Sequence, residues 1–113
     1  MPSPYTYKYD RSWVSTYVGC TIEIRLDGNP STGYTWIRDP FLGNNILSDE
    51  NLDVHSSFVR DPASKGTVGV GGFFKILVKP KKRGDHALRL VYCRPFDGAG
   101  LYDKRFALFF SVS

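Results

Sequence analysis

The chain has 113 residues, which is the usual size of one domain built on one hydrophobic core. Hydrophobic residues make up 42% of it and charged residues 23%, a balance that excludes a disordered tail, a collagen-like chain and a coiled coil. Fifteen basic residues against eleven acidic ones leave a net charge of +4, which permits an acidic partner without requiring one. We expect a single domain over residues 1–113, with residues 1–10 as a candidate loosely ordered N-terminal extension.

No run of apolar residues approaches the roughly 18 that a membrane helix needs, and the start of the chain lacks the pattern of a signal peptide. We therefore expect a soluble cytoplasmic protein without a membrane partner; a vesicular or lysosomal location would require that the chain is processed. Two cysteines and two histidines show no metal-ligand spacing, so neither a metal nor a cofactor is expected.

The apolar residues alternate with polar ones at a period of two, which indicates strands with one buried face. Turn-forming Gly, Pro, Asn and Asp residues separate these segments. About seven short strands in such a chain favour an all-β sandwich of two sheets. In chain order the expected strands are Ser12–Val18, Cys20–Leu26, Gly33–Arg38 and Leu52–Val59, then segments around Phe74–Val78, Leu88–Tyr92 and Phe106–Val112.

The strand count also predicts which loops lie together. Strands that alternate in direction send every second connection to the same end of a sandwich. If Cys20–Leu26 is the second strand, the loops at 28–32, 61–71 and 93–102 share one end. The basic turn at 79–84 then lies at the opposite end.

The first of these loops is stiffened by its own residues. Pro30 fixes its φ angle and pushes Asn29 toward an extended conformation, while Gly33 can adopt a positive φ. A stiff loop loses little entropy when a partner grips it, although an ordinary β-turn would have the same composition. The candidate binding residues here are Asn29, Pro30, Ser31, Thr32, Gly33 and Tyr34.

The second and third loops are less specific taken alone. Gly69, Val70, Gly71 and Gly72 suggest a phosphate-binding loop, but such loops open a helix, whereas this one leads into a strand. The glycines could instead let the backbone lie against a partner, or form a flexible surface loop. The third loop opens with Arg94, Pro95 and Phe96, and its aromatic ring is either tucked into the core or presented as an anchor.

Taken in order, the three loops resemble the chagasin-type inhibitors of papain-family cysteine peptidases. The resemblance rests on an NPxTG[YF] loop, a GxGG loop and an RPW-type loop, and it spans roughly Gly19 to the C-terminus. It includes Thr35 and Trp36 after the first motif and Arg105 and Phe106 in the last strand. Two positions depart from the family pattern: Ser31 replaces a frequent Thr, and Phe96 replaces the usual Trp.

The resemblance implies an immunoglobulin-like sandwich that blocks a papain-like (cathepsin-type) peptidase reversibly and tightly, as a monomer before the complex forms. By this resemblance, residues 29–34 would cover the catalytic Cys/His pair of the peptidase. Gly69, Val70, Gly71 and Gly72 would run along the non-primed side of the cleft, and Arg94, Pro95 and Phe96 would contact the primed side. Such a protein would have no catalytic residues and would not be an enzyme.

Three other interpretations fit the sequence less well. Cys20, Trp36 and Cys93 imitate the spacing of an immunoglobulin adhesion or recognition module, but strand alternation places Cys20 on the buried face and Cys93 on the outer face, which predicts two free thiols. A hydrolase built on Cys93 and His86 is disfavoured, because the two residues fall on opposite faces of one expected strand. The basic turn is typical of a solvated turn, so no nucleic-acid partner is expected.

Overall fold

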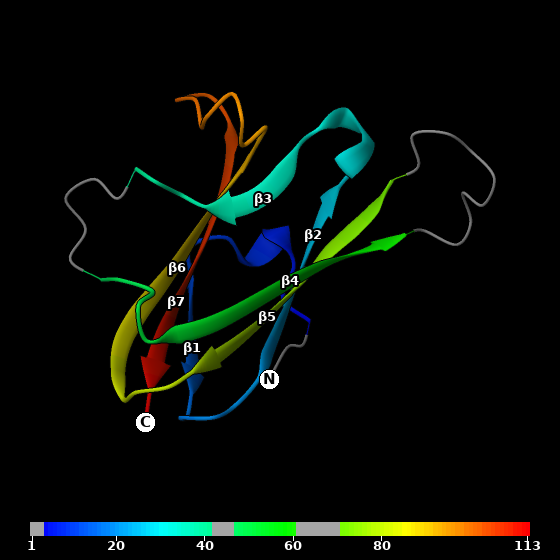
Figure 1. The fold of residues 1–113 in the computed structure, drawn as a ribbon. Coiled ribbons are helices and arrows are strands. Elements are labelled where there is room, and N and C mark those ends of the chain that lie inside the picture. Colours follow the sequence, from blue (N-terminus) through cyan, green and yellow to red (C-terminus); the bar gives the residue numbers. More distant parts are fainter. Residues whose placement is uncertain (1–3, 42–46, 61–70) are drawn as a thin grey trace.

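The computed structural model describes residues 4–41, 47–60 and 71–113. Its strands form two facing sheets, as Figure 1 shows, which confirms the all-β sandwich. The larger sheet has the order β1-β7-β6-β3 and the smaller one β2-β5-β4. The described strands are β1 (Ser12–Thr16), β2 (Ile22–Gly28), β3 (Thr35–Arg38), β4 (Leu52–Arg60), β5 (Gly72–Pro80), β6 (Gly84–Cys93) and β7 (Lys104–Val112).

The period-two alternation of the sequence reappears as alternating burial. In β7 the side chains of Phe106, Leu108 and Phe110 are at most 1% exposed, while their sequence neighbours are partly exposed. The inward faces of both sheets meet in one cluster, to which β2 contributes Ile22, Ile24 and Leu26. Burial of this apolar surface is the main term that holds the two sheets together.

The strand register brings the ends of the three candidate loops together. Gly28, the last residue of β2, pairs with Gly72 at the start of β5, and Gly72 also pairs with Arg60 at the end of β4. In the larger sheet, Thr35 at the start of β3 pairs with Cys93 at the end of β6. Figure 1 shows the β2–β3 and β6–β7 connections at the upper end and the β5–β6 turn at the lower end, as the strand count predicts.

The N-terminal segment differs from the expected loose extension. Tyr5 is only 5% exposed and belongs to the core cluster. Its backbone donates to the carbonyl of Glu23 and accepts from the amide of Arg25, so it covers the free edge of β2. The Tyr7 hydroxyl then donates to the carbonyl of Arg105. For residues 5–10 the expectation was wrong, because alternating tyrosines supply both apolar area and polar tips for docking.

Both cysteines are free, and the fold keeps them apart. Cys20 precedes β2 at the end of the sandwich that carries the β5–β6 turn, whereas Cys93 ends β6 among the candidate loops. Cys20 is half-buried rather than fully buried as expected. Cys93 lies outside the interior cluster, in keeping with an outer position, yet that side is covered and the residue is 1% exposed. Burial raises the pKa of its thiol, and the nearby Asp103 carboxylate raises it further.

Gly28 is fixed by a close approach that generates a stability prediction. A methyl group at this position would lie 2.7 Å from Cδ2 of Phe74 and 3.2 Å from Cε1 of Tyr92. Gly28→Ala should lower the free energy of unfolding by about 1–3 kcal/mol, as overpacking of a filled core does. Gly71→Ala is the matched control, because a methyl group there meets no atom within 4 Å. Urea unfolding of both variants checks this, and equal stability would contradict the packing described.

Candidate functional site

The β2–β3 loop is a single ordered turn built by its own side chains. Asn29 Oδ1 accepts hydrogen bonds from the amide of Ser31 at 3.2 Å and from its hydroxyl at 2.7 Å, which starts a 3-10 turn over Pro30–Thr32. The Thr32 hydroxyl donates to the carbonyl of Asn29 at 2.7 Å. Gly33 ends the turn at φ +85°, a conformation that glycine adopts without strain. These local hydrogen bonds hold the turn in one conformation, in agreement with the stiffness predicted from Pro30 and Gly33.

Tyr92 of β6 supports this loop from below. Its hydroxyl accepts a hydrogen bond from the Asn29 amide at 2.9 Å. Its ring lies 5.3 Å from that of Tyr34 and 5.2 Å from that of Trp36, and it meets Phe74 of the facing sheet edge-on at 6.3 Å. Such aromatic contacts add to the stabilisation from burial alone. The aromatic cluster thus joins the loop to both sheets.

Arg94 ties the β2–β3 loop to the β6–β7 loop. Its Nε donates to the carbonyl of Thr32 at 3.1 Å, and its guanidinium lies 5.1 Å from the centre of the Tyr34 ring. The same guanidinium lies 3.9 Å from a carboxylate oxygen of Asp97 in its own loop. A planar guanidinium can stack and donate at once, which an ammonium group cannot do. One side chain therefore fixes the relative position of two candidate loops.

The β6–β7 loop settles the question about Phe96. Its side chain is 79% exposed, so it is presented to solvent and does not belong to the core. The backbone beneath it is turned tightly, with the Asp97 amide donating to the carbonyl of Arg94 at 3.0 Å and the Gly98 amide to that of Pro95 at 3.2 Å. An exposed ring on an ordered turn is the arrangement expected of an interface anchor.

Only part of the second loop falls within the described residues. Gly71 is exposed, and Gly72 begins β5 opposite both Gly28 and Arg60. Gly69 and Val70 lie outside the described residues. The described part of this loop thus leaves the sandwich at the same end as the other two.

Three notable residues at this end of the sandwich lie outside the sequence motifs. Tyr92 fits an ordinary strand pattern, and its support of the loop is seen in its hydrogen bond with Asn29 and its contact with Tyr34. Leu101 and Tyr102 are 81% and 100% exposed, in the same loop as Phe96. Their apolar side chains in a turn-rich segment were the available signal, because turns usually carry small or polar residues.

The geometry does not support the catalytic alternative. Cys93 is buried at one end of β6, and His86 is buried near the other, with its Nε2 lying 2.8 Å from the carbonyl oxygen of Lys82. At about 3.3 Å per strand residue, the two side chains stand roughly 23 Å apart, too far for a nucleophile and its base.

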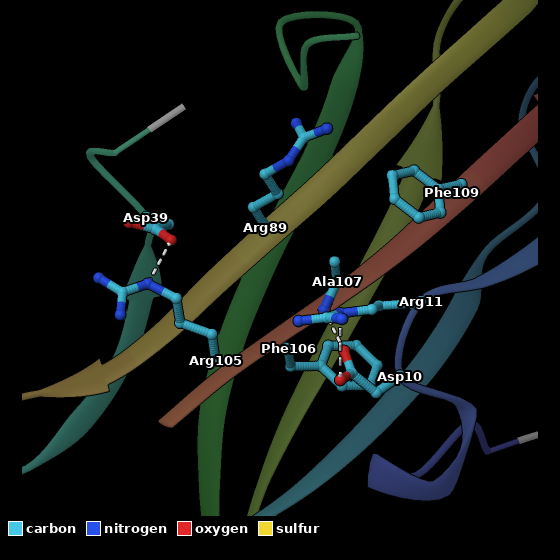
Figure 2. A pocket seen from close by; sticks show the side chains of 8 residues that line it. All are labelled: Asp10, Arg11, Asp39, Arg89, Arg105, Phe106, Ala107 and Phe109. Carbon is cyan, nitrogen blue, oxygen red and sulfur yellow. Dashed lines mark hydrogen bonds and ion pairs between the residues drawn. The ribbon is translucent and has the colours of Figure 1, made fainter. Parts of the chain in front are cut away.

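A shallow pocket of about 210 Å³ opens on the outer face of the larger sheet, as Figure 2 shows. Arg105 pairs with Asp39 across it, Asp10 accepts from the Ala107 amide, and Nη1 of Arg89 donates to the carbonyl of Leu47. Across residues 4–41, 47–60 and 71–113, no cluster of three His, Cys, Asp or Glu side chains could hold a metal ion. In the same ranges no helix has the length and apolarity to cross a membrane.

Comparisons with known proteins agree with the sequence motifs. The family model described as Chagasin family peptidase inhibitor I42 matches residues 15–109. Chagasin of Trypanosoma cruzi is 29% identical over 108 residues, covering 96% of each chain, and Amoebiasin-1 of Entamoeba histolytica is 35% identical over 86 residues, covering 76% of each. The solved structure of Leishmania mexicana ICP is 50% identical, with a TM-score of 0.68 over 89% of this chain and 87% of that one.

These matches bear on the alternatives as well as on the fold. A family of peptidase inhibitors is neither a family of adhesion modules nor one of hydrolases, in agreement with the prediction that the protein is not an enzyme. The matched region contains all three loop motifs and the residues that join them. The chain belongs to the chagasin family of peptidase inhibitors.

Proposed function

We propose that this protein inhibits papain-like cysteine peptidases by inserting one end of its sandwich into the active-site cleft. The observation that carries the proposal is the Arg94 side chain, which holds the β2–β3 and β6–β7 loops against each other through Thr32 and Tyr34. Two loops with a fixed relative position can act as one wedge. The register of Gly72 against Gly28 supports placing the second loop beside them.

Each loop has a proposed place in the cleft. Residues 29–34 cover the catalytic Cys/His pair of the peptidase, Gly69, Val70, Gly71 and Gly72 follow the non-primed side, and Arg94, Pro95 and Phe96 contact the primed side. The small side chains of Ser31 and Thr32, both exposed at the loop tip, suit the narrowest part of a cleft. The exposed ring of Phe96 suits a wider, apolar part.

Inhibition by this route needs no reaction in the inhibitor. A cysteine peptidase cleaves when a carbonyl carbon approaches its thiolate while backbone and side-chain donors stabilise the oxyanion. In the β2–β3 loop, the carbonyls of Asn29, Pro30 and Thr32 already accept hydrogen bonds from Thr32, Gly33 and Arg94. Moving one of them into attack position would break the turn. These three carbonyls therefore stay out of the attack position as long as the turn is intact.

Stiffness explains why such binding is tight. The loops need little ordering when the complex forms, so less of the interaction free energy is lost to conformational entropy. Rigid partners of this kind change shape little on binding.

The free thiols bear on the compartment. We infer a reducing compartment such as the cytoplasm, because Cys20 and Cys93 lie at opposite ends of the sandwich and cannot form an internal disulfide.

Titration of papain with the purified protein tests the proposal. We expect stoichiometric, reversible loss of peptidase activity, with the inhibitor recovered intact.

Thr32→Arg should weaken inhibition by about a hundredfold (roughly 2.7 kcal/mol), because a bulky side chain cannot enter the cleft and the loop cannot move aside. Thr32→Ser is the matched control, since it keeps the hydroxyl that donates to Asn29. Equal inhibition by the arginine variant would contradict the wedge.

Removing Arg94 should separate the two loops. Arg94→Ala loses the hydrogen bond to Thr32 and the contact with Tyr34, and it should weaken inhibition by about five- to thirtyfold while lowering NMR order parameters in residues 30–34. Arg38→Ala removes the same charge from the far end of β3 and should leave both properties unchanged. Rigid loops and full potency in the Arg94 variant would show that the loops do not need this link.

Phe96→Ala separates an anchor from a structural residue. Because the ring is 79% exposed, its loss should leave the melting temperature unchanged. As an anchor it should contribute about 1–3 kcal/mol, so the dissociation constant for papain should rise by roughly five- to 150-fold. Calorimetry and inhibition assays give both values. A lowered melting temperature with unchanged potency would assign the ring to the fold instead.

A further inference from the structure

We propose that Leu101 and Tyr102 form a second apolar contact with the target peptidase, on the rim beside the part of the cleft that Phe96 enters. The contact lies outside the substrate groove, so it sets which papain-like peptidases the protein holds most tightly. This inference rests on the proposed function. It concerns two residues that none of the three loop motifs contains.

The turn that carries this pair is held in one conformation. The Asp103 carboxylate accepts a hydrogen bond from the Gly100 amide at 2.7 Å, and the Asp103 amide donates back to the Gly100 carbonyl at 3.4 Å. From below, Nη1 of Arg105 donates to the carbonyls of Leu101 and Asp103 at 3.2 and 3.3 Å. The backbone is therefore hydrogen-bonded at Gly100, Leu101 and Asp103, on both sides of Tyr102.

The supporting arginine is itself anchored. Its Nε donates to Oδ2 of Asp39 at 2.8 Å, and Figure 2 shows this pair joining β7 to the segment that follows β3. Asp39 is 8% exposed, and its other carboxylate oxygen accepts from the Phe41 amide at 2.9 Å. An ion pair with a buried, fully hydrogen-bonded partner fixes geometry better than a surface pair does. The ion pair between Arg105 and the buried Asp39 therefore holds this turn in place.

The side chains of Leu101 and Tyr102 are not buried by folding. Tyr102 is 100% exposed and Leu101 is 81% exposed, so neither contributes to the core. Glycine, proline, asparagine, aspartate and serine normally occupy turns, because they suit the backbone and water. A leucine and a tyrosine exposed on a hydrogen-bonded turn have the properties of binding residues: large contact area, little backbone freedom to lose and, for the tyrosine, a polar tip.

The position of Leu101 and Tyr102 beside the proposed peptidase-binding loops indicates that their partner is the same peptidase. The pair belongs to the same loop as Phe96, and Arg94 fixes that loop against Thr32. When residues 29–34 and Phe96 occupy the cleft, the turn at 100–103 reaches the adjoining surface of the same peptidase. An apolar rim patch on the enzyme is the chemistry that matches a leucine and a tyrosine. Peptidases of one family share the cleft more closely than the rim, so the contact discriminates among them.

The test compares two double variants against papain and several cathepsin-type peptidases. Leu101→Ser with Tyr102→Ser should raise the dissociation constant by about tenfold or more for at least one enzyme, by a factor that differs among enzymes, and chiefly through faster dissociation. Tyr17→Ser with Val18→Ser is the matched control, since these exposed residues lie at the opposite end, where Gly19 bonds to Pro80. It should change no dissociation constant, and both variants should keep the melting temperature.

The outcomes separate the inference from the function on which it rests. If the unaltered protein inhibits but the Leu101/Tyr102 variant stays within twofold of it for every enzyme, the rim contact is refuted and the wedge stands. If the unaltered protein inhibits none of the enzymes, the proposed function itself fails. Exposed leucine and tyrosine side chains can also bind a membrane surface, which sedimentation with vesicles containing phosphatidylserine measures. If the Leu101/Tyr102 variant loses vesicle binding but keeps inhibition, the pair is a membrane contact and the proposal is overturned.

Discussion

The hydroxyl of Tyr92 accepts a hydrogen bond from the Asn29 amide, and its ring packs against Tyr34, Trp36 and Phe74. Through these contacts one side chain of β6 holds the β2–β3 loop and reaches the facing sheet. Gly28 lacks a side chain where the rings of Phe74 and Tyr92 come close, so the chain can turn directly above them. The aromatic cluster is the platform on which the proposed wedge is built.

Rigidity above that platform is supplied by polar contacts rather than by burial. Asn29 and Thr32 hold the first loop internally, Arg94 joins it to the third, and Asp103 and Arg105 hold the far part of the third loop. The side chains that extend beyond this framework, Phe96, Leu101 and Tyr102, are exposed. A frame that is ordered before binding and apolar at its tips loses little entropy and gains contact area when it meets a partner.

Much of this arrangement could be predicted from the sequence. Period-two alternation located the strands, and the count of strands placed the loops at a common end, because both signals depend on local chain direction. Sheet order and the parallel pairing of β1 with β7 could not be derived in this way, since they depend on contacts between distant residues. The same limit hid the role of Tyr92, and it hid the docking of Tyr5 on β2, which was expected to lie in a loose extension.

The cysteines show how alternation can fail in detail. It predicted the outer side of β6 for Cys93, but it could not show that other residues cover this side and leave the thiol 1% exposed. It predicted a buried Cys20, but β2 begins only at Ile22, so Cys20 is half-buried. Alternation gives the direction of a side chain along a strand; burial also depends on where the strand begins and on what covers it.

Hydrogen exchange of the protein alone and bound to an inactivated papain tests the central claim most directly. The account predicts that complex formation slows amide exchange in residues 29–34, at Gly71 and Gly72 and in residues 94–103, while the β5–β6 turn at the opposite end is unchanged. Slowed exchange at that turn, or on the outer face of the larger sheet, with no change in the loops would contradict it.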